Sequence, residues 1–354
     1  MADKGRITYV DTAKFLAIWM VIVSHSCMHS DVARYLFAFH VPMFFFLYGY
    51  VYHVKEDRQS LKAFLSSKVP ALFGRVLVPY FLFAFILGEA LSVKTLPFVL
   101  WGSLQSLNPV TSTHLWFLPC YFLAVLIWDV IMELSPRNRA FRIAAGGVIV
   151  LLSATSAILN GESDIQLSLG NYIVHLTGLG DNSNNELYVG FPMAVNVAFT
   201  GVTFIYSGYL VRRLLDKLAE KPLWNVIIMA GAIFLGTLCF KLNHGDEKLI
   251  AMSYARYGNY LLFLAAAVLL STAALLISKY IDNRLFAKLG KYTLAIYGFH
   301  LTLTFFGETV ARLIHISNSN IQALVVGTIT LALSCAIIPV IRYIDPYLLG
   351  ERKK

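Results

Sequence analysis

Long apolar runs, separated by shorter polar and basic stretches, account for most of this chain. A run of about 20 apolar residues is long enough to cross a bilayer as one helix. The pattern therefore predicts transmembrane helices near residues 7–28, 37–53, 75–92, 115–134, 141–160, 192–211, 222–241, 256–278, 292–313 and 320–342. Polar stretches at residues 94–114 and 161–190 interrupt the series. The expected fold is an all-α integral membrane bundle of about ten helices, forming a single domain over residues 1–354.

The first apolar run is unusual because it carries Asp11, Lys14 and His25 within its span. At about 100° per residue, Lys14 and His25 fall on nearly the same helix face. A charge near the bilayer centre costs about 2.5–3.5 kcal/mol or more, so such residues indicate function. The structural alternative is that Asp11 neutralises Lys14 and that His25 bonds to a neighbouring helix. Three polar residues on one face favour a functional stripe.

The composition excludes an ordinary soluble domain, since 58% of the residues are hydrophobic and only 14% are charged. The net charge of +9 would suggest nucleic acid as the partner of a soluble protein. Here the basic residues gather in every second connection, around residues 55–75, 137–142, 212–221 and 279–291. The positive-inside rule then places both termini in the cytoplasm of a multi-pass inner-membrane protein. The expected partners are membrane lipids, and nucleic acid is not expected.

This orientation gives the polar residues depths in the bilayer and allows two clusters, while the sequence does not say whether their helices touch. The inner cluster contains Asp11, Lys14 and His300, and the outer cluster contains His25, His40, His114 and Glu308. The outer histidines, together with His29, do not follow a known ligand spacing, so no metal is expected. The cysteines show no paired spacing and are interpreted as apolar packing residues.

Several motifs, in order along the chain, resemble the acyltransferase-3 family of multispanning membrane O-acyltransferases. They are YVDTAK ending at Lys14, the basic-x10-His spacing ending at His25, VPMFFFLYG from Val41, RVLVPY from Arg75, HLWFL from His114 and LAIYGFH ending at His300. The pattern is similar to the compact branch that acetylates surface sugars. Lys14 stands where the family more often has Arg, and Tyr48 where a small Ser is usual. Replacing Arg by Lys keeps the charge and loses the planar fork for bidentate contacts.

The resemblance implies transfer of an acyl group, usually acetyl from acetyl-CoA, to a hydroxyl of a cell-envelope glycan or its lipid-linked precursor. Such a reaction needs a base for the hydroxyl proton and a group that stabilises the oxyanion. Histidine suits a base near neutral pH, and the family motif marks His25. Because no Ser or Cys lies in a recognisable nucleophile elbow, we expect direct transfer. Lys14 lies about 16 Å from His25 along the helix, comparable to an extended pantetheine arm.

The candidate residues fall into three groups. The catalytic candidates are His25, Lys14, Asp11, His300 and Glu308. The candidates for the CoA phosphates are Lys14, Lys68, Arg75, Arg212, Arg213, Lys288 and Lys291. The candidates for the acceptor are His114, Trp116, Tyr297, Tyr48 and His40. The alternative for most of the basic residues is contact with lipid headgroups, and for His300 and Tyr297 it is a hydrogen bond between helices.

Two other function classes remain open from the residues alone. A transporter or flippase for a lipid-linked sugar also uses intramembrane charges. Neither an inverted repeat nor a matched pair of broken helices supports it. A structural or sensory membrane protein would not need the polar stripe of the first helix.

Overall fold

The computed structural model describes residues 7–54, 60–87, 96–102, 113–134, 139–161, 191–218 and 222–344. Within these ranges the regular structure is helical, and the only β-type pairing is an isolated bridge between Ala251 and Arg256. The prediction of an all-α protein is confirmed. The predicted polar stretch 161–190 lies almost entirely outside the described residues.

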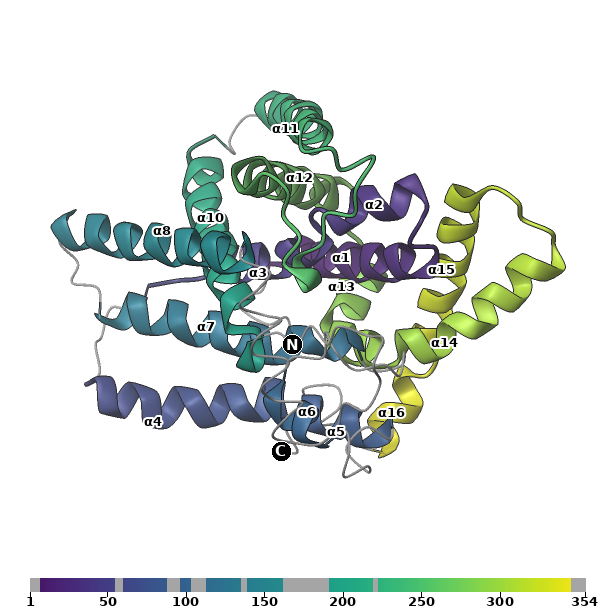
Figure 1. Ribbon diagram of the computed structural model, residues 1–354, viewed down its shortest axis with the longest axis horizontal. Helices are drawn as coiled ribbons and strands as arrows, with labels where there is room; N and C mark the ends of the chain where they lie inside the picture. The colour runs from purple at the N-terminus through teal and green to yellow at the C-terminus, as the bar shows by residue number, and fades with distance from the viewer. Residues whose placement is uncertain are drawn as a thin grey trace. The chain divides into compact units, whose positions relative to one another are not determined.

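The helices follow one another along the whole described chain (Figure 1). In order they are α1 Thr8–Ser26, α2 Asp31–Phe37, α3 His40–Tyr50, α4 Leu61–Leu72, the π-helix η1 Phe73–Leu77, α5 Val78–Ile86, α6 Leu96–Trp101, the 3₁₀ turn η4 Thr113–Trp116, α7 Phe117–Leu134, α8 Arg139–Gly161, η5 Pro192–Ala194, α10 Val195–Leu218, α11 Pro222–Leu242, η6 Met252–Tyr254, α12 Tyr260–Tyr280, α13 Arg284–Leu289, η7 Gly290–Tyr292, α14 Thr293–Leu313, α15 Ser319–Ala336 and α16 Ile338–Ile344.

Seven helical stretches among the described residues are long and apolar enough to cross a membrane. They are Asp31–Tyr50, Leu61–Ile86, His114–Leu134, Pro192–Lys217, Pro222–Leu242, Tyr260–Tyr280 and Ser319–Tyr343. Helices α1 and α14 have sufficient length but fall outside this set because of their polar residues. Asp11, Lys14 and His25 lower the hydropathy of α1, and His300 and Glu308 lower that of α14. The chain is therefore a multi-pass membrane protein, and both α1 and α14 carry candidate site residues.

Two predicted helix boundaries were wrong. The predicted helix 37–53 corresponds to α3. A separate helix, α2, was not predicted, and it ends before Phe39, whose φ of −145° is not helical. The predicted helix 75–92 begins at Leu61, where Ser60 caps the amide of Ala63. Helix α4 continues through Pro70, which has no amide proton for the backbone ladder, and passes directly into the π-helix η1.

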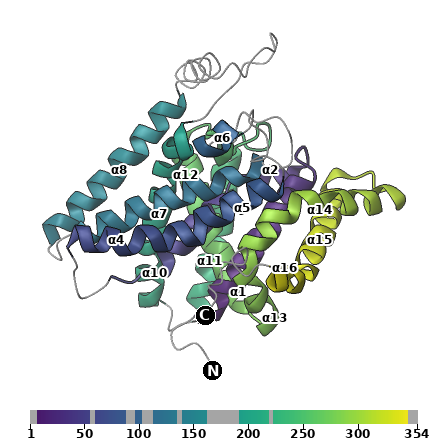
Figure 2. The same cartoon turned by 90° about the horizontal axis from the view of Figure 1, so that it is seen from below.

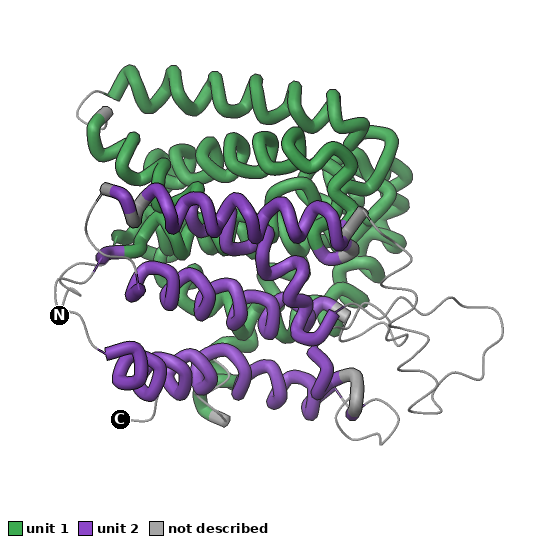
Figure 3. Tube along the Cα trace, turned by 60° about the vertical axis from the view of Figure 1, so that its left-hand side comes forward, with its two compact units in different colours: residues 1–52, 207–252, 256–354 green, residues 53–206, 253–255 purple. Residues whose placement is uncertain are grey.

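The chain divides into two compact units, which are described separately (Figure 3). Unit 1 comprises residues 1–52, 207–252 and 256–354. Unit 2 comprises residues 53–206 and 253–255. Helix α10 contributes its first part to unit 2 and its last part to unit 1.

Helix α1 is the centre of unit 1. It packs against α2, α3, α12, α13, α14 and α15. Helices α14 and α15 run side by side along much of their length (Figures 1 and 2), and α11 packs on α12. Two glycines permit close approach to α1, as is common between membrane helices. A Cβ added at Gly290 would overlap the carbonyl oxygen of Asp11, and one at Gly327 would meet the backbone of Val23.

Unit 2 is held together by contacts of α4 and η1 with α7, and of α8 with the first part of α10. Lys68 of α4 forms an ion pair with Asp129 of α7, with 2.5 Å between Nζ and Oδ2. The hydroxyls of Ser156 and Thr200 share a hydrogen bond of 2.5 Å between α8 and α10. Buried polar pairs of this kind fix the relative positions of helices inside a bilayer.

Candidate active site

Three imidazole rings from different helices lie close together inside unit 1. The ring of His25, in the last turn of α1, lies with its centroid 6.2 Å from that of His40, the first residue of α3. On its other flank, the ring of His300 of α14 lies 5.6 Å away. We call His25, His40 and His300 the histidine cluster.

The histidine cluster is largely shielded from solvent. His40 and His300 are 1% and 0% exposed, whereas His25 retains partial exposure. The ring of Phe37 meets both His25 and His40 edge-on, with centroid distances of 5.3 and 5.0 Å. His25 is therefore the most exposed member of the histidine cluster.

Backbone hydrogen bonds define the tautomers of the two flanking rings. The Nδ1 atom of His40 lies 2.8 Å from the carbonyl oxygen of Leu36, and that of His300 lies 2.7 Å from the carbonyl oxygen of Tyr297. A carbonyl oxygen only accepts hydrogen bonds, so Nδ1 carries a proton in both rings, and in the neutral form of each ring Nε2 carries the lone pair. No hydrogen bond of the described residues involves the ring of His25, so its nitrogens are not committed to the backbone.

His300 does not join the inner cluster that the sequence allows, because it lies beside His25 and not with Asp11 and Lys14. The reason is the point at which α14 starts. The chain before it forms α13 and η7, and Gly290 of η7 lies against the backbone of Asp11. Helix α14 therefore starts level with a point beyond the first turn of α1. His300 lies about two turns further along α14, and this brings it level with His25.

Asp11 and Lys14 form the expected pair at the other end of the stripe. The distance between Lys14 Nζ and Asp11 Oδ1 is 3.2 Å. Asp11 is 4% exposed and Lys14 is 34% exposed, so the ammonium group remains accessible while the carboxylate is enclosed. Eleven residues of helix separate Lys14 from His25, about 16 Å along the axis.

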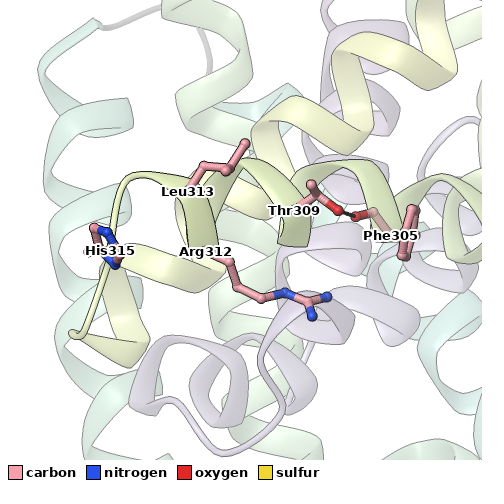
Figure 4. A pocket seen from close by; sticks show the side chains of 5 residues that line it. All are labelled: Phe305, Thr309, Arg312, Leu313 and His315. Atoms are coloured by element: carbon pink, nitrogen blue, oxygen red, sulfur yellow. Dashed lines mark hydrogen bonds between the residues drawn. The ribbon is translucent and has the colours of Figure 1, made fainter.

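Glu308 lies about two turns beyond His300 on α14 and is paired with Arg312 at 3.3 Å. Near this pair the end of α14 borders an open, mostly apolar pocket of about 330 Å³ (Figure 4). Its lining residues are Phe305, Thr309, Arg312, Leu313 and His315. Glu308 lies about 12 Å from His300 along the helix axis, and its ion pair among the described residues is with Arg312, so it does not join the histidine cluster.

The proposed acceptor residues are divided between the units. Tyr297 is buried in unit 1, with its ring centroid 5.8 Å from that of His300. Tyr48 is half-buried on α3, and its ring contacts Tyr52 at 6.3 Å. His114 and Trp116 are buried in η4 of unit 2.

The proposed phosphate-binding residues differ in accessibility. Arg75, Arg213, Lys288 and Lys291 are exposed. Lys68 is paired with the buried Asp129, and Arg212 is paired with Asp216 at 3.4 Å. Lys288 and Lys291 lie on α13 and η7, which pack against α1 near Lys14. Within the described ranges, no group of three or more His, Cys, Asp or Glu residues is arranged to hold a metal ion.

The sequence reasoning missed the groups that enclose and orient the cluster. Phe37 forms part of its wall, and the carbonyls of Leu36 and Tyr297 orient the two flanking rings. The sequence spacing between each carbonyl and its histidine could have indicated these hydrogen bonds. Each carbonyl lies three or four residues before the histidine that it holds, within reach of a helical side chain.

Comparison with known proteins adds one finding. A family model described as an acyltransferase domain matches residues 7–339. No curated protein and no solved structure matches the chain.

Proposed function

Because the chain belongs to the acyltransferase-3 family, we propose that it transfers an acetyl group from acetyl-CoA to a hydroxyl of a cell-envelope glycan or a lipid-linked sugar. The chain is a membrane acyltransferase; the donor, the acceptor and the residue roles are the proposal. The observation that carries it is the meeting of His25, His40 and His300 in the interior of the helical unit. Burying an imidazole inside a bilayer costs free energy. Three of them, brought together from separate helices, therefore indicate a function.

In the proposed reaction His25 removes the proton from the acceptor hydroxyl as its oxygen attacks the thioester carbonyl. The tetrahedral intermediate then collapses and the C–S bond breaks. The proton that His25 removed from the hydroxyl passes to the sulfur, and CoA leaves as the thiol. The products are the O-acetyl ester and CoA, so no covalent enzyme intermediate is required. General base catalysis of this kind contributes about 10²–10⁴-fold to the rate.

His40 and His300 act in this proposal as positioning residues. Each presents the lone pair of Nε2, since Nδ1 donates to a backbone carbonyl. A lone-pair nitrogen beside His25 accepts a hydrogen bond from the imidazolium that forms during transfer. The neutral rings therefore stabilise the protonated base without adding a competing charge. Tyr297, next to His300, is the acceptor-binding residue that we propose for unit 1.

Lys14 is proposed to bind the phosphate end of the donor, with help from Lys288 and Lys291. These cations are accessible, and their elements pack at the same end of α1. The distance of about 16 Å from Lys14 to His25 suits an extended pantetheine arm that carries the thioester to the base. The remaining inner arginines are not needed for this path.

The positive-inside pattern supports a sided reaction in the inner membrane, with both termini in the cytoplasm. The donor enters from the cytoplasm near Lys14, and the acceptor meets the acetyl group from the outer side near His25. In oriented vesicles, CoA added to the inner face should compete with the donor, and CoA on the outer face should not. Competition from the outer face alone would overturn the sidedness.

The decisive experiment measures transfer of labelled acetyl from acetyl-CoA to an envelope glycan by the purified protein. His25→Ala should lower the rate by about 10²–10⁴-fold while the folded yield is retained. His29→Ala is the matched control, because His29 lies four residues further along and is exposed. Normal transfer by His25→Ala would exclude His25 as the base, and the absence of any transfer by the wild type would refute the proposed donor and acceptor.

A further inference from the structure

Four helix ends of unit 1 meet at a group of tyrosines and cations that the proposed reaction does not use. The ends belong to α1, α3, α10 and α12. We call this group the tyrosine–cation patch; its members are Tyr9, Tyr50, Tyr209, Arg212, Arg213 and Lys279.

The patch is built around a hydrogen bond of 2.9 Å between the hydroxyls of Tyr9 and Tyr50. The ammonium of Lys279 lies 5.1 Å from the centroid of the Tyr9 ring. The guanidinium of Arg212 lies 5.9 Å from the Tyr50 ring, and it donates from Nη1 to the carbonyl oxygen of Tyr50 at 3.2 Å. These contacts hold two cations against one linked pair of rings.

A third cation extends the patch along α10. Arg213 lies 4.7 Å from the centroid of the Tyr209 ring, which itself contacts the ring of Tyr52 at 6.4 Å. The helix comes close to α3 here, since a Cβ added at Gly208 would overlap the carbonyl oxygen of Phe46. This close packing fixes the positions of both arginines relative to Tyr50.

The patch carries positive charge that carboxylates balance only in part. Asp216, which is 63% exposed, lies 3.4 Å from Arg212. Within the described part of the chain, neither Lys279 nor Arg213 lies within ion-pair distance of a carboxylate. Aromatic faces attract cations without neutralising them. Two cations are therefore held in place and remain available to an anion.

The patch lies on a different face of α1 from the proposed donor path. Tyr9 and His25 are sixteen residues apart, which places them about 160° apart around the helix, and Lys14 is about 140° from Tyr9. The flanks of the patch are apolar. Leu210 and Leu214, on either side of Arg213 on α10, are 44% and 54% exposed, and Tyr280 follows Lys279 with 57% exposure.

We propose that the tyrosine–cation patch binds the phosphate headgroup of an anionic phospholipid at the cytoplasmic surface. Cations at helix ends attract anionic headgroups, and tyrosines are favoured at that level of the membrane. The exposed leucines beside Arg213 accommodate the acyl chains, which a soluble nucleotide donor does not possess. The sequence suggested Arg212 and Arg213 as ligands of the donor phosphates. In this proposal they bind the phosphate of a phospholipid instead.

The test measures lipid retention by native mass spectrometry, with phosphatidylglycerol and phosphatidylcholine of the same chain length as probes. The double variant Lys279→Gln/Arg213→Gln should bind phosphatidylglycerol about thirtyfold more weakly, about fivefold for each basic side chain. Binding of phosphatidylcholine should not change. The matched control is Lys241→Gln/Lys248→Gln, which removes two exposed cations from elsewhere in unit 1 and should retain the wild-type affinity.

Equal loss in the control pair, or no loss in the patch variant, would refute the lipid site. Displacement of phosphatidylglycerol by CoA, with loss of CoA binding in the patch variant, would assign the patch to the donor and also overturn the proposal. If the double variant does not fold, Arg213→Gln alone supplies the test, because its side chain is exposed and it should still weaken phosphatidylglycerol binding about fivefold. The lipid measurement needs no acyl transfer, so it is independent of the proposed reaction.

Discussion

Replacing Lys68 by Met is expected to destabilise the protein and to leave donor binding unchanged. The Nζ atom of Lys68 lies 2.5 Å from Oδ2 of Asp129, whose side chain is 2% exposed. Methionine keeps a long unbranched side chain but removes the charge. The Asp129 carboxylate then loses its cation in a site that water scarcely reaches.

The size of the loss follows from the burial of the two partners. Removing one partner of a buried ion pair costs about 3–5 kcal/mol. Because the Lys68 side chain is 33% exposed, water compensates part of the loss, and we expect about 2–3 kcal/mol. At a length of 354 residues that free energy lowers the melting temperature by about 3–4 °C.

The assay is a double-mutant cycle read by thermal unfolding of the purified protein. Asp129→Asn removes the buried charge, so Lys68→Met/Asp129→Asn should be more stable than Lys68→Met alone. Lys62→Met is the control, since Lys62 lies on the same helix and is exposed. The KM for acetyl-CoA should be the same in all folded variants. A raised KM in Lys68→Met together with an unchanged melting temperature would refute this reasoning and make Lys68 a donor-binding residue.

Three further predictions concern the first turns of α1. Lys14→Ala should raise the KM for the donor about tenfold, whereas Lys14→Arg should retain most activity, because either cation attracts phosphate. Equal KM values for Lys14→Ala and the wild type in kinetic assays would exclude the donor role. Asp11→Asn should reduce the folded yield measured by size-exclusion chromatography, since it leaves a cation without its partner, and a well-folded but inactive protein would instead give Asp11 a chemical role. Gly290→Ala should lower the free energy of unfolding by about 1–3 kcal/mol, because the added Cβ overlaps the Asp11 carbonyl. The control Gly231→Ala adds a Cβ with no atom within 4 Å and should leave the stability unchanged. Equal effects of the two variants in thermal unfolding would contradict the close packing at Gly290.

The local features of the protein were predictable from its sequence. Apolar runs of membrane-spanning length marked most of the helices, since hydropathy depends on composition alone. The pairing of Asp11 with Lys14 followed from their spacing of three residues within one helix. The family motifs also single out His25 and His300, although they do not indicate that the two rings lie close together. Each of these inferences needs only residues that are close in the chain, where helical geometry sets the distances.

Only the tertiary structure decided which helices meet and at what depth. His300 lies beside His25 and not with Asp11 and Lys14, because α13 and η7 determine where α14 begins. The ion pair of Lys68 with Asp129 and the hydroxyl contact of Tyr9 with Tyr50 join residues separated by tens of positions. Helix periodicity says which face of a helix is polar, but it does not specify the neighbour that covers that face. The neighbour is determined by crossing angles and close approaches, such as that of Gly290 to α1, which arise only when the whole unit packs.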